Sequence, residues 1–354
     1  MRINFISSSL SGGGAERVMV ILANYFVIKG HEVTIITFNN GEAFDVDQKV
    51  NRVKLHSGSI KNHTIRSLKS LISYYRKKAN RPDIAISFIC AINFVSIIAC
   101  RLFAIKIIVS EHNNHYRKNG RVGEFTWNYL YRLANTVTVL TSFDKPFFEK
   151  KGSKVVVMPN PYSFIPLSDS SKLRKKIILA VGNCNRYHAK GFDNLIALIP
   201  PVLKKYPNWI LKIVGGGDQG LTFLKELAIQ NGVEPQVQFT GFSKDVGLLM
   251  KVSEIFILSS RYEGLPMALL EAMSQGMACI AYDCVTGPSE IIVNNTNGLL
   301  IEDQNVDAMQ KGLIQLIGND LLRKNLGYNA ISSLERYSIE NIYKLWEKLF
   351  QQIL

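Results

Sequence analysis

The chain has 354 residues, of which 47% are hydrophobic, enough for two packed cores and too many for a disordered or fibrous protein. The net charge of +14 is unevenly placed, because residues 1–165 hold 23 Lys and Arg against 10 Asp and Glu, so only this half suits an anionic partner. The five cysteines form no Cys-x2-Cys pair and the first residues do not resemble a signal peptide, so we expect a reduced, cytoplasmic protein.

Short apolar runs alternate with segments of helical periodicity along the whole chain. The runs are 3–7, 33–38, 84–88, 107–110, 137–140, 177–181, 210–214, 237–240 and 255–258. Such alternation is typical of parallel sheets covered by helices. We predict an α/β fold with two doubly wound, Rossmann-like domains facing a cleft, at 1–165 and 166–335, and a C-terminal helix at 336–354 that packs on the first domain. The apolar stretch 84–100 is slightly too short to span a bilayer and is interpreted as a buried strand and helix.

A glycine-rich loop follows the first predicted strand. Gly12, Gly13 and Gly14 precede a helix, so main-chain N–H groups can approach an anion there. A dinucleotide oxidoreductase would need Gly-x-Gly-x-x-Gly and an acidic residue about 20 positions later, whereas this chain has Arg17 and then Asn39-Asn40. The pattern weakens the dehydrogenase hypothesis and leaves two alternatives, an anion-binding loop or a turn needed only for packing.

Residues 61–82 contain seven Lys and Arg and no acid, and their apolar residues recur at helical spacing. Such a helix can lie on an anionic bilayer, or it can face the core with a solvated outer side. The basic residues expected to meet a bilayer are Lys61, Arg66, Lys69, Arg76, Lys77 and Lys78. No nucleic-acid-binding signature accompanies the charge, so nucleic acid is not an expected partner.

Two loops of the second half carry charged residues after apolar strands. Arg186 and Lys190 follow 177–181 and can neutralise a diphosphate, although a solvated basic turn is the alternative. Glu263 follows 255–258, and Glu271 lies inside an apolar helix predicted to start at Pro266. A buried Glu271 would need a polar partner, which sugar or ribose hydroxyls would supply, whereas an exposed one would simply reach solvent.

An ordered set of motifs over about residues 2–340 resembles the retaining glycosyltransferases of family 4. The motifs are Gly-Gly-Gly-Ala-Glu-Arg at 12–17, Ser-Glu-His-Asn at 110–113, Pro-Asn-Pro at 159–161, Lys-Gly-Phe-Asp at 190–193, Val-Gly-Gly-Gly-Asp at 214–218, Glu-x7-Glu at 263–271 and Gly-Pro-Ser-Glu at 287–290. The resemblance implies a GT-B architecture in which the second domain binds a nucleotide-sugar, the first binds the acceptor, and catalysis needs no metal. Within the family, the chain looks most like N-acetylgalactosaminyltransferases that extend lipid-linked glycans.

The resemblance also implies residue roles. His112, Glu263 and Lys190 are the expected catalytic residues, with His112 beside the reacting sugar. The expected donor-binding residues are Arg186, Lys190, Gly215, Gly217, Phe242, Glu263, Gly264, Leu265, Pro266 and Glu271. The expected acceptor or phosphate residues are Gly13, Gly14, Arg17, Arg117 and Lys118. The family usually has Arg where this chain has Asn183, and we hypothesise that Arg186 supplies the missing charge.

We therefore expect a peripheral enzyme at the inner face of the plasma membrane. It would move a hexose or N-acetylhexosamine, with GalNAc the first choice, from a UDP-sugar to a polyprenyl-diphosphate-linked saccharide for O-antigen, capsule or another glycan. No cofactor is expected, and Asp45-x-Asp47 is interpreted as a polar loop and not as a metal site. A nucleotide-sugar epimerase and a catalytically silent nucleotide-sugar-binding protein remain alternatives.

Overall fold

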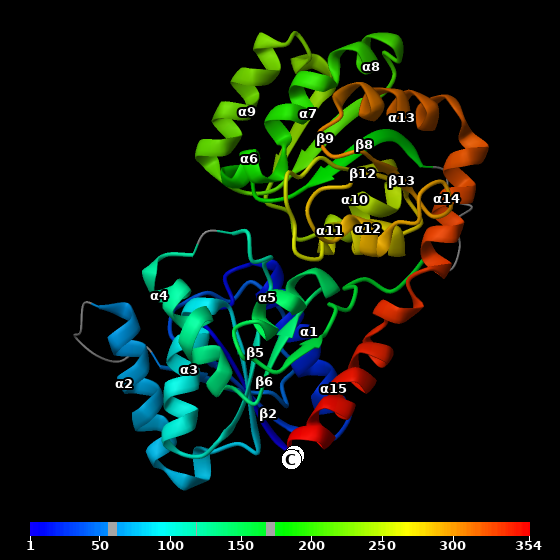
Figure 1. Ribbon diagram of the computed structural model, residues 1–354. Helices are drawn as coiled ribbons and strands as arrows, with labels where there is room; N and C mark the ends of the chain where they lie inside the picture. The colour runs from blue at the N-terminus through cyan, green and yellow to red at the C-terminus, as the bar shows by residue number, and fades with distance from the viewer. Residues whose placement is uncertain (56–61, 118, 168–173) are drawn as a thin grey trace. The chain divides into compact units, whose positions relative to one another are not determined.

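The computed structural model describes residues 1–55, 62–117, 119–167 and 174–354. The chain forms two compact units (Figure 1). Unit 1 comprises Met1–Pro161 and Tyr337–Leu354, and unit 2 comprises Tyr162–Arg336. Unit 1 is therefore assembled from both ends of the chain, whereas unit 2 is continuous.

Unit 1 is built on one parallel sheet, which in the described residues has seven strands in the order β3-β2-β1-β4-β5-β6-β7. The strands are β1 (Arg2–Ser7), β2 (Glu32–Thr37), β3 (Asn51–Lys54), β4 (Ile84–Phe88), β5 (Lys106–Ser110), β6 (Thr136–Val139) and β7 (Val155–Val157). The central strands are almost fully buried, as their apolar sequences predict. The edge strands β3 and β7 are short, and neither was among the apolar runs predicted as strands.

Helices cover both faces of this sheet, with α1 and α15 on one side and α2 and α3 on the other (Figure 1). The helices of unit 1 are α1 (Gly14–Ile28), α2 (His63–Arg76), α3 (Cys90–Leu102), α4 (Arg121–Phe125), α5 (Lys145–Glu149) and α15 (Ile339–Ile353), with short turns η1 (Lys78–Asn80), η2 (Thr126–Leu130), η3 (Tyr131–Leu133) and η4 (Ser142–Asp144). The stretch 84–100 forms β4 and most of α3, which confirms the strand-and-helix interpretation. Within the described ranges, no helix is both long and apolar enough to cross a bilayer.

The C-terminal helix α15 packs against α1 through aromatic side chains. The ring of Phe26 lies 5.4 Å from that of Tyr343 and 5.7 Å from that of Phe350, both in edge-to-face geometry. Trp346 is buried beside them, and the Tyr343 hydroxyl lies 2.9 Å from Nε2 of His31. Aromatic pairs of this geometry add to the stability gained from area burial. Residues 337–354 are thus part of the core of unit 1.

The apolar stripe of α2 faces the interior of unit 1. Leu71 and Tyr75 are fully buried in the same core cluster as residues of α3. Of the basic residues that the sequence assigned to a bilayer, Lys69, Arg76, Lys77 and Lys78 are exposed, Arg66 is half-buried, and Lys61 lies outside the described residues. This packing matches the core-facing alternative for α2. The exposed surface of the helix includes the basic residues Lys69 and Arg76.

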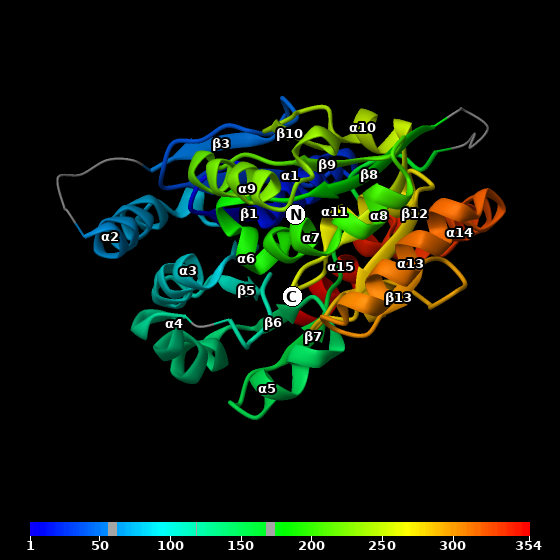
Figure 2. The same ribbon diagram turned by 90° about the horizontal axis from the view of Figure 1, so that it is seen from above.

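Unit 2 is built on a second parallel sheet (Figure 2). In the described residues, its strand order is β10-β9-β8-β11-β12-β13. The strands are β8 (Lys175–Val181), β9 (Ile210–Val214), β10 (Val237–Gly241), β11 (Ser253–Leu258), β12 (Ala278–Tyr282) and β13 (Leu299–Ile301). The helices and turns are η5 (Cys184–Arg186), α6 (Tyr187–Lys190), α7 (Phe192–Leu198), α8 (Pro200–Lys205), α9 (Asp218–Gln230), η6 (Glu234–Gln236), α10 (Val246–Val252), α11 (Met267–Ser274), α12 (Pro288–Ile291), α13 (Val306–Gly318) and α14 (Asp320–Ser332). Both sheets confirm the predicted α/β, doubly wound class.

Candidate functional site

The charged loops of unit 2 leave the sheet where the strand order reverses. Chain-consecutive strands β8, β9 and β10 lie to one side, and β11, β12 and β13 lie to the other, so the reversal falls between β8 and β11. Lys190 is in the connection that follows β8, and Glu263 is in the one that follows β11. Ligands of doubly wound sheets bind at this point, outside the carboxyl ends of the strands.

Lys190 and Glu263 form an ion pair across the two loops. The Lys190 Nζ lies 2.7 Å from Oε1 of Glu263, and the Ser260 hydroxyl donates a hydrogen bond of 2.6 Å to the same oxygen. The two side chains are only 20% and 10% exposed. The structure thus brings together two of the predicted catalytic residues, which are 73 positions apart in the sequence. Partial burial strengthens this interaction relative to a surface pair.

Arg261 ties the same two loops together. Its guanidinium donates to the carboxylate of Asp193 at 2.7 Å and to the side-chain oxygen of Asn194 at 2.6 Å. Burial by itself would raise the pKa of Asp193, but the hydrogen bonds and charge of Arg261 outweigh it and hold this pKa below its usual value. Sequence reasoning gave Arg261 no role. The available signal was an Arg two residues before Glu263, with Asp193 as a complementary acid in the first turn of α7.

Glycines let the main chains of neighbouring loops touch. A Cβ on Gly215 would lie 1.7 Å from the carbonyl oxygen of Gly182, and one on Gly191 would lie 1.9 Å from that of Ser259. Gly191 also has φ +65°, and Gly217 has φ +120°. Any other residue would clash or be strained at these positions. The predicted glycines therefore bring the loops after β8, β9 and β11 into direct contact.

Glu271 lies in α11, the helix that follows the Glu263 loop, and is 2% exposed. The alternative in which this side chain simply reaches solvent is therefore wrong. Pro266 is the residue before the helix and not its first residue as predicted. Leu265 and Pro266 are buried, while Gly264 is half-buried, so this stretch offers a ligand its main chain more than its side chains.

Two further residues of the expected donor set have exposed side chains. Phe242, directly after β10, is exposed, and Arg186 is exposed at the end of η5. Asn183 caps η5, because its side chain accepts a hydrogen bond of 2.9 Å from the N–H of Asn185. Asn is among the side chains that suit such a cap. Where the family usually has Arg, this chain therefore has a residue that stabilises the turn carrying Arg186.

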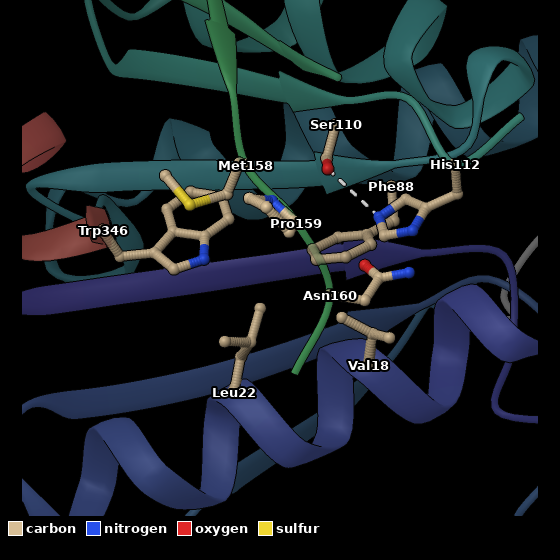
Figure 3. Close-up of a pocket in the computed structure, with 9 residues that line it drawn as sticks. All are labelled: Val18, Leu22, Phe88, Ser110, His112, Met158, Pro159, Asn160 and Trp346. Atoms are coloured by element: carbon tan, nitrogen blue, oxygen red, sulfur yellow. Dashed lines mark hydrogen bonds between the residues drawn. The ribbon is translucent and has the colours of Figure 1, made fainter. Parts of the chain in front are cut away.

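His112 lies directly after β5 in unit 1 (Figure 3). Its ring stacks on Phe88 with 4.9 Å between centroids, and its Nε2 lies 3.1 Å from the hydroxyl of Ser110. Burial lowers the pKa of His112 to about 3, so the ring is neutral at physiological pH. The small pocket around it is lined by Val18, Leu22, Phe88, Ser110, Met158, Pro159, Asn160 and Trp346.

Glu111 is buried and holds a polar network beside β5. The indole N–H of Trp127 donates to its carboxylate at 3.2 Å, and the hydroxyl of Tyr131 donates to the same oxygen. Asn93 in turn donates to the Tyr131 hydroxyl at 2.8 Å. Burial raises the pKa of Glu111 to about 7. This network links the loop after β5, which carries Glu111 and His112, to η2 and η3.

A second hollow of unit 1 lies around His115. Its Nδ1 is 2.7 Å from the buried carboxylate of Asp144, and its ring stacks on Phe143 and Phe147. The hollow is lined by His115, Tyr116, Arg117, Asn119, Glu124, Trp127, Asn128, Phe147 and Lys151. Arg117, which the sequence predicts to bind the acceptor, lines this hollow, whereas Lys118 falls outside the described residues. Sequence reasoning missed both His115 and Lys151.

Comparisons with known proteins cover both units. Residues 12–163 match the model of Glycosyltransferase Family 4, and residues 167–333 match that of Glycosyl transferases group 1. An uncharacterised glycosyltransferase of Haemophilus influenzae is 32% identical over 97% of this chain and 98% of its own length. The chain belongs to glycosyltransferase family 4.

A second relative is a glycosyltransferase, and solved structures show the fold. The family 4 chain is 30% identical, over 100% of its length and 99% of the relative, to the Campylobacter jejuni GalNAc-alpha-(1->4)-GalNAc-alpha-(1->3)-diNAcBac-PP-undecaprenol alpha-1,4-N-acetyl-D-galactosaminyltransferase. Sucrose-phosphate synthase from Thermosynechococcus elongatus has a TM-score of 0.85 at 17% identity, covering 99% of this chain and 98% of that one. Anabaena HepE, in complex with UDP and glucose, has a TM-score of 0.83 at 18% identity, covering 99% and 100%. The predicted GT-B fold is confirmed.

The glycine loop of this family 4 glycosyltransferase lies at the start of α1. Gly13 precedes the helix and Gly14 is its first residue. The carboxylate of Glu16 folds back over Gly13, since a Cβ there would be 2.0 Å from its Oε2. Arg17 lies over the ring of Phe44, 5.7 Å from its centroid. An anion at this helix end would have to displace the acid that already occupies the first turn.

The Asp45-x-Asp47 pair lies in the loop after β2 and is tied to α1 through Asn24. The side chain of Asn24 donates to the Asp45 carbonyl at 3.2 Å and accepts from the Asp47 N–H at 2.9 Å. Among the residues that the structure describes, no three His, Cys, Asp or Glu side chains gather as they would around a metal ion.

Proposed function

We propose that this family 4 glycosyltransferase moves a hexose or N-acetylhexosamine, with GalNAc the first choice, from a UDP-sugar to a polyprenyl-diphosphate-linked saccharide, with retention and without a metal. The ion pair between Lys190 and Glu263 supports this proposal, because it holds a cation and a carboxylate together at the switch point of unit 2, where ligands of doubly wound sheets bind. The name of the C. jejuni relative gives such a lipid-linked acceptor, and HepE was solved with UDP and glucose.

Transfer of the sugar requires stabilisation of the charges that develop during bond cleavage and correct positioning of the acceptor hydroxyl. When the bond between sugar and UDP breaks, positive charge develops on the sugar ring and negative charge on the leaving diphosphate. Lys190 would stabilise the leaving diphosphate, Glu263 would accept hydrogen bonds from the sugar hydroxyls, and Glu271 would bind the ribose. The N-terminus of α11 would add roughly 0.3–1 kcal/mol. The departing phosphate can itself take the acceptor's proton, so the step needs no second carboxylate.

The acceptor would bind to unit 1. Arg117 and Lys151 line one hollow with His115, and their hydrogen-bond partners are neutral amides, Asn113 and Asn128. Both cations can therefore exchange a neutral partner for a phosphate. The exposed basic residues of α2 would attract an anionic inner-membrane surface, with about 1 kcal/mol for each Lys or Arg close to it. Unchanged liposome binding after neutralisation of Lys69, Arg76 and Lys77 would contradict this membrane role.

The test is an assay with UDP-GalNAc, UDP-GlcNAc, UDP-glucose and UDP-galactose, each with and without a polyprenyl-diphosphate glycan, in the presence of EDTA. We expect acceptor-dependent transfer that EDTA leaves unchanged and that Lys190→Ala abolishes. Isomerisation of the donor without acceptor would instead indicate an epimerase, and binding without turnover would indicate a silent protein. The NMR spectrum of the product reports retention or inversion. If Arg186→Ala keeps full turnover, Arg186 does not replace the missing Arg.

A further inference from the structure

The two groups that the proposed function assigns to the donor form an ion pair with each other. The Lys190 ammonium lies 2.7 Å from the Glu263 carboxylate, and both side chains are largely withdrawn from solvent. In the proposed function, these groups serve different parts of one molecule, because Lys190 takes the diphosphate and Glu263 takes the sugar hydroxyls. A nucleotide-sugar can give each residue a new partner, with the diphosphate binding Lys190 and the sugar hydroxyls binding Glu263. A free nucleoside diphosphate can give a new partner to Lys190 only.

The main chains on either side of the pair are fixed. The Ser259 hydroxyl donates to the carbonyl of Lys190 at 2.9 Å, and the main chain of Gly191 lies directly against that of Ser259. Arg261 then clamps the two loops through Asp193. Moving the loops apart to separate the pair would break these contacts. A ligand that binds Lys190 therefore competes with Glu263 mainly through side-chain rearrangement.

We propose that the Lys190–Glu263 pair is a specificity device that makes the site favour a nucleotide-sugar over the free nucleoside diphosphate product. This inference rests on the proposed function. When the diphosphate alone binds, Glu263 loses its cationic partner while partly buried and comes to lie near additional negative charge, which is unfavourable. When the nucleotide-sugar binds, its hydroxyls donate hydrogen bonds to Glu263 and offset that loss. After transfer, re-formation of the pair favours release of the nucleoside diphosphate.

The experiment compares the Kd of UDP with that of the UDP-sugar used in turnover, by isothermal titration calorimetry on the full chain. Glu263→Gln keeps the size of the side chain and removes its charge. We expect UDP to bind at least about fivefold more tightly to this variant, and the UDP-sugar to bind less tightly, so the preference for the sugar-bearing ligand shrinks. The inhibition constant of UDP should fall by a similar factor in any residual turnover.

Glu254→Gln is the matched control. Glu254 also forms an ion pair, 3.1 Å from Arg323, with 18% exposure, but it lies near the start of β11 and not after its end. This control should leave both Kd values unchanged. Glu263→Ala gives the same test if the Gln variant does not fold.

Each outcome has a distinct meaning. Unchanged or weaker UDP binding by Glu263→Gln overturns the inference while leaving the proposed function intact, provided that the wild type binds the UDP-sugar and transfers the sugar. If the wild type binds neither UDP nor a UDP-sugar, both the inference and the proposed donor are wrong.

Discussion

Replacing Arg261 by Ala should weaken donor binding through the position of Lys190. The change removes the hydrogen bonds to Asp193 and Asn194 and one to a main-chain carbonyl of the same loop. Hydrogen bonds to charged groups contribute about 1.5–3 kcal/mol and neutral ones about 0.5–1.5 kcal/mol. Because Arg261 and Asp193 are each 21% exposed, solvent screens their interaction and reduces its contribution to stability. We expect unit 2 to lose about 2–3 kcal/mol of unfolding free energy and the UDP-sugar to bind about tenfold more weakly.

Arg323→Ala separates this effect from a general loss of stability. Arg323 makes a comparable fork with Glu254 and Asp320, at 3.1 and 3.0 Å, and is only 9% exposed. It should cost at least as much stability in a denaturant titration but leave the donor KM unchanged. Arg261→Lys restores the charge without the planar fork and should recover only part of the affinity. If Arg261→Ala destabilises the protein yet keeps the wild-type donor KM, Arg261 does not position Lys190.

Three other substitutions test separate parts of the fold. Gly191→Ala should destabilise unit 2 by more than about 1 kcal/mol and reduce turnover, because its Cβ would meet a carbonyl oxygen at 1.9 Å; Gly232→Ala, with nearly the same φ but nothing within 4 Å, should cost less in the same thermal melt. Burial raises the pKa of Glu111 from 4.5 to about 7, so the folded state keeps a proton that the unfolded chain loses between these values. The unfolding free energy of the wild type should therefore fall relative to Glu111→Gln as pH rises from 4.5 to about 7, and a parallel pH dependence of the two proteins would contradict that pKa. Trp346→Ala should destabilise unit 1 by about 3–5 kcal/mol, whereas exposed Leu345 should tolerate the same change; equal effects in denaturant titrations would show that α15 is not part of that core.

The residue pattern predicted the architecture because most central strands are apolar runs and the longer helices have an apolar face. It did not identify β12, which lies between β11 and β13 in the second sheet. The same reasoning could not decide between two roles for α2, since the periodicity of Leu71 and Tyr75 is identical for a helix that meets a core and one that meets a bilayer. Only the packing of these side chains on the α3 side of the sheet distinguishes the two. The edge strand β3 was not predicted, because a short strand that is partly exposed does not require a run of apolar residues.

At the site, local sequence motifs identified Lys190 and Glu263, but they could not predict which residues of the two segments contact each other. Arg261 gains its meaning from Asp193, 68 positions earlier, and the sequence alone does not say that these loops touch. His115 and Asp144 pose the same difficulty, because an isolated His and an isolated Asp carry no signal until the fold places them 2.7 Å apart. The motif around Glu111 was visible, yet the burial that raises its pKa depends on the fold. Its hydrogen-bond donors, Trp127 and Tyr131, come from η2 and η3, and their hydrogen bonds lower this pKa without offsetting the burial.

The chain passes from unit 1 to unit 2 after Pro161 and returns to unit 1 at Tyr337, and this path affects the order in which the two units can fold during synthesis. Most of unit 1 precedes unit 2 in the sequence, but Trp346 and Phe350 of α15, which follow unit 2, belong to the core of unit 1. That core therefore stays incomplete while unit 2 is being translated. Tyr162–Arg336, by contrast, leaves the ribosome as one uninterrupted piece and can fold as soon as it emerges. Unit 1 should therefore complete its folding after unit 2, because Phe26 of α1 lacks its aromatic neighbours until α15 is made.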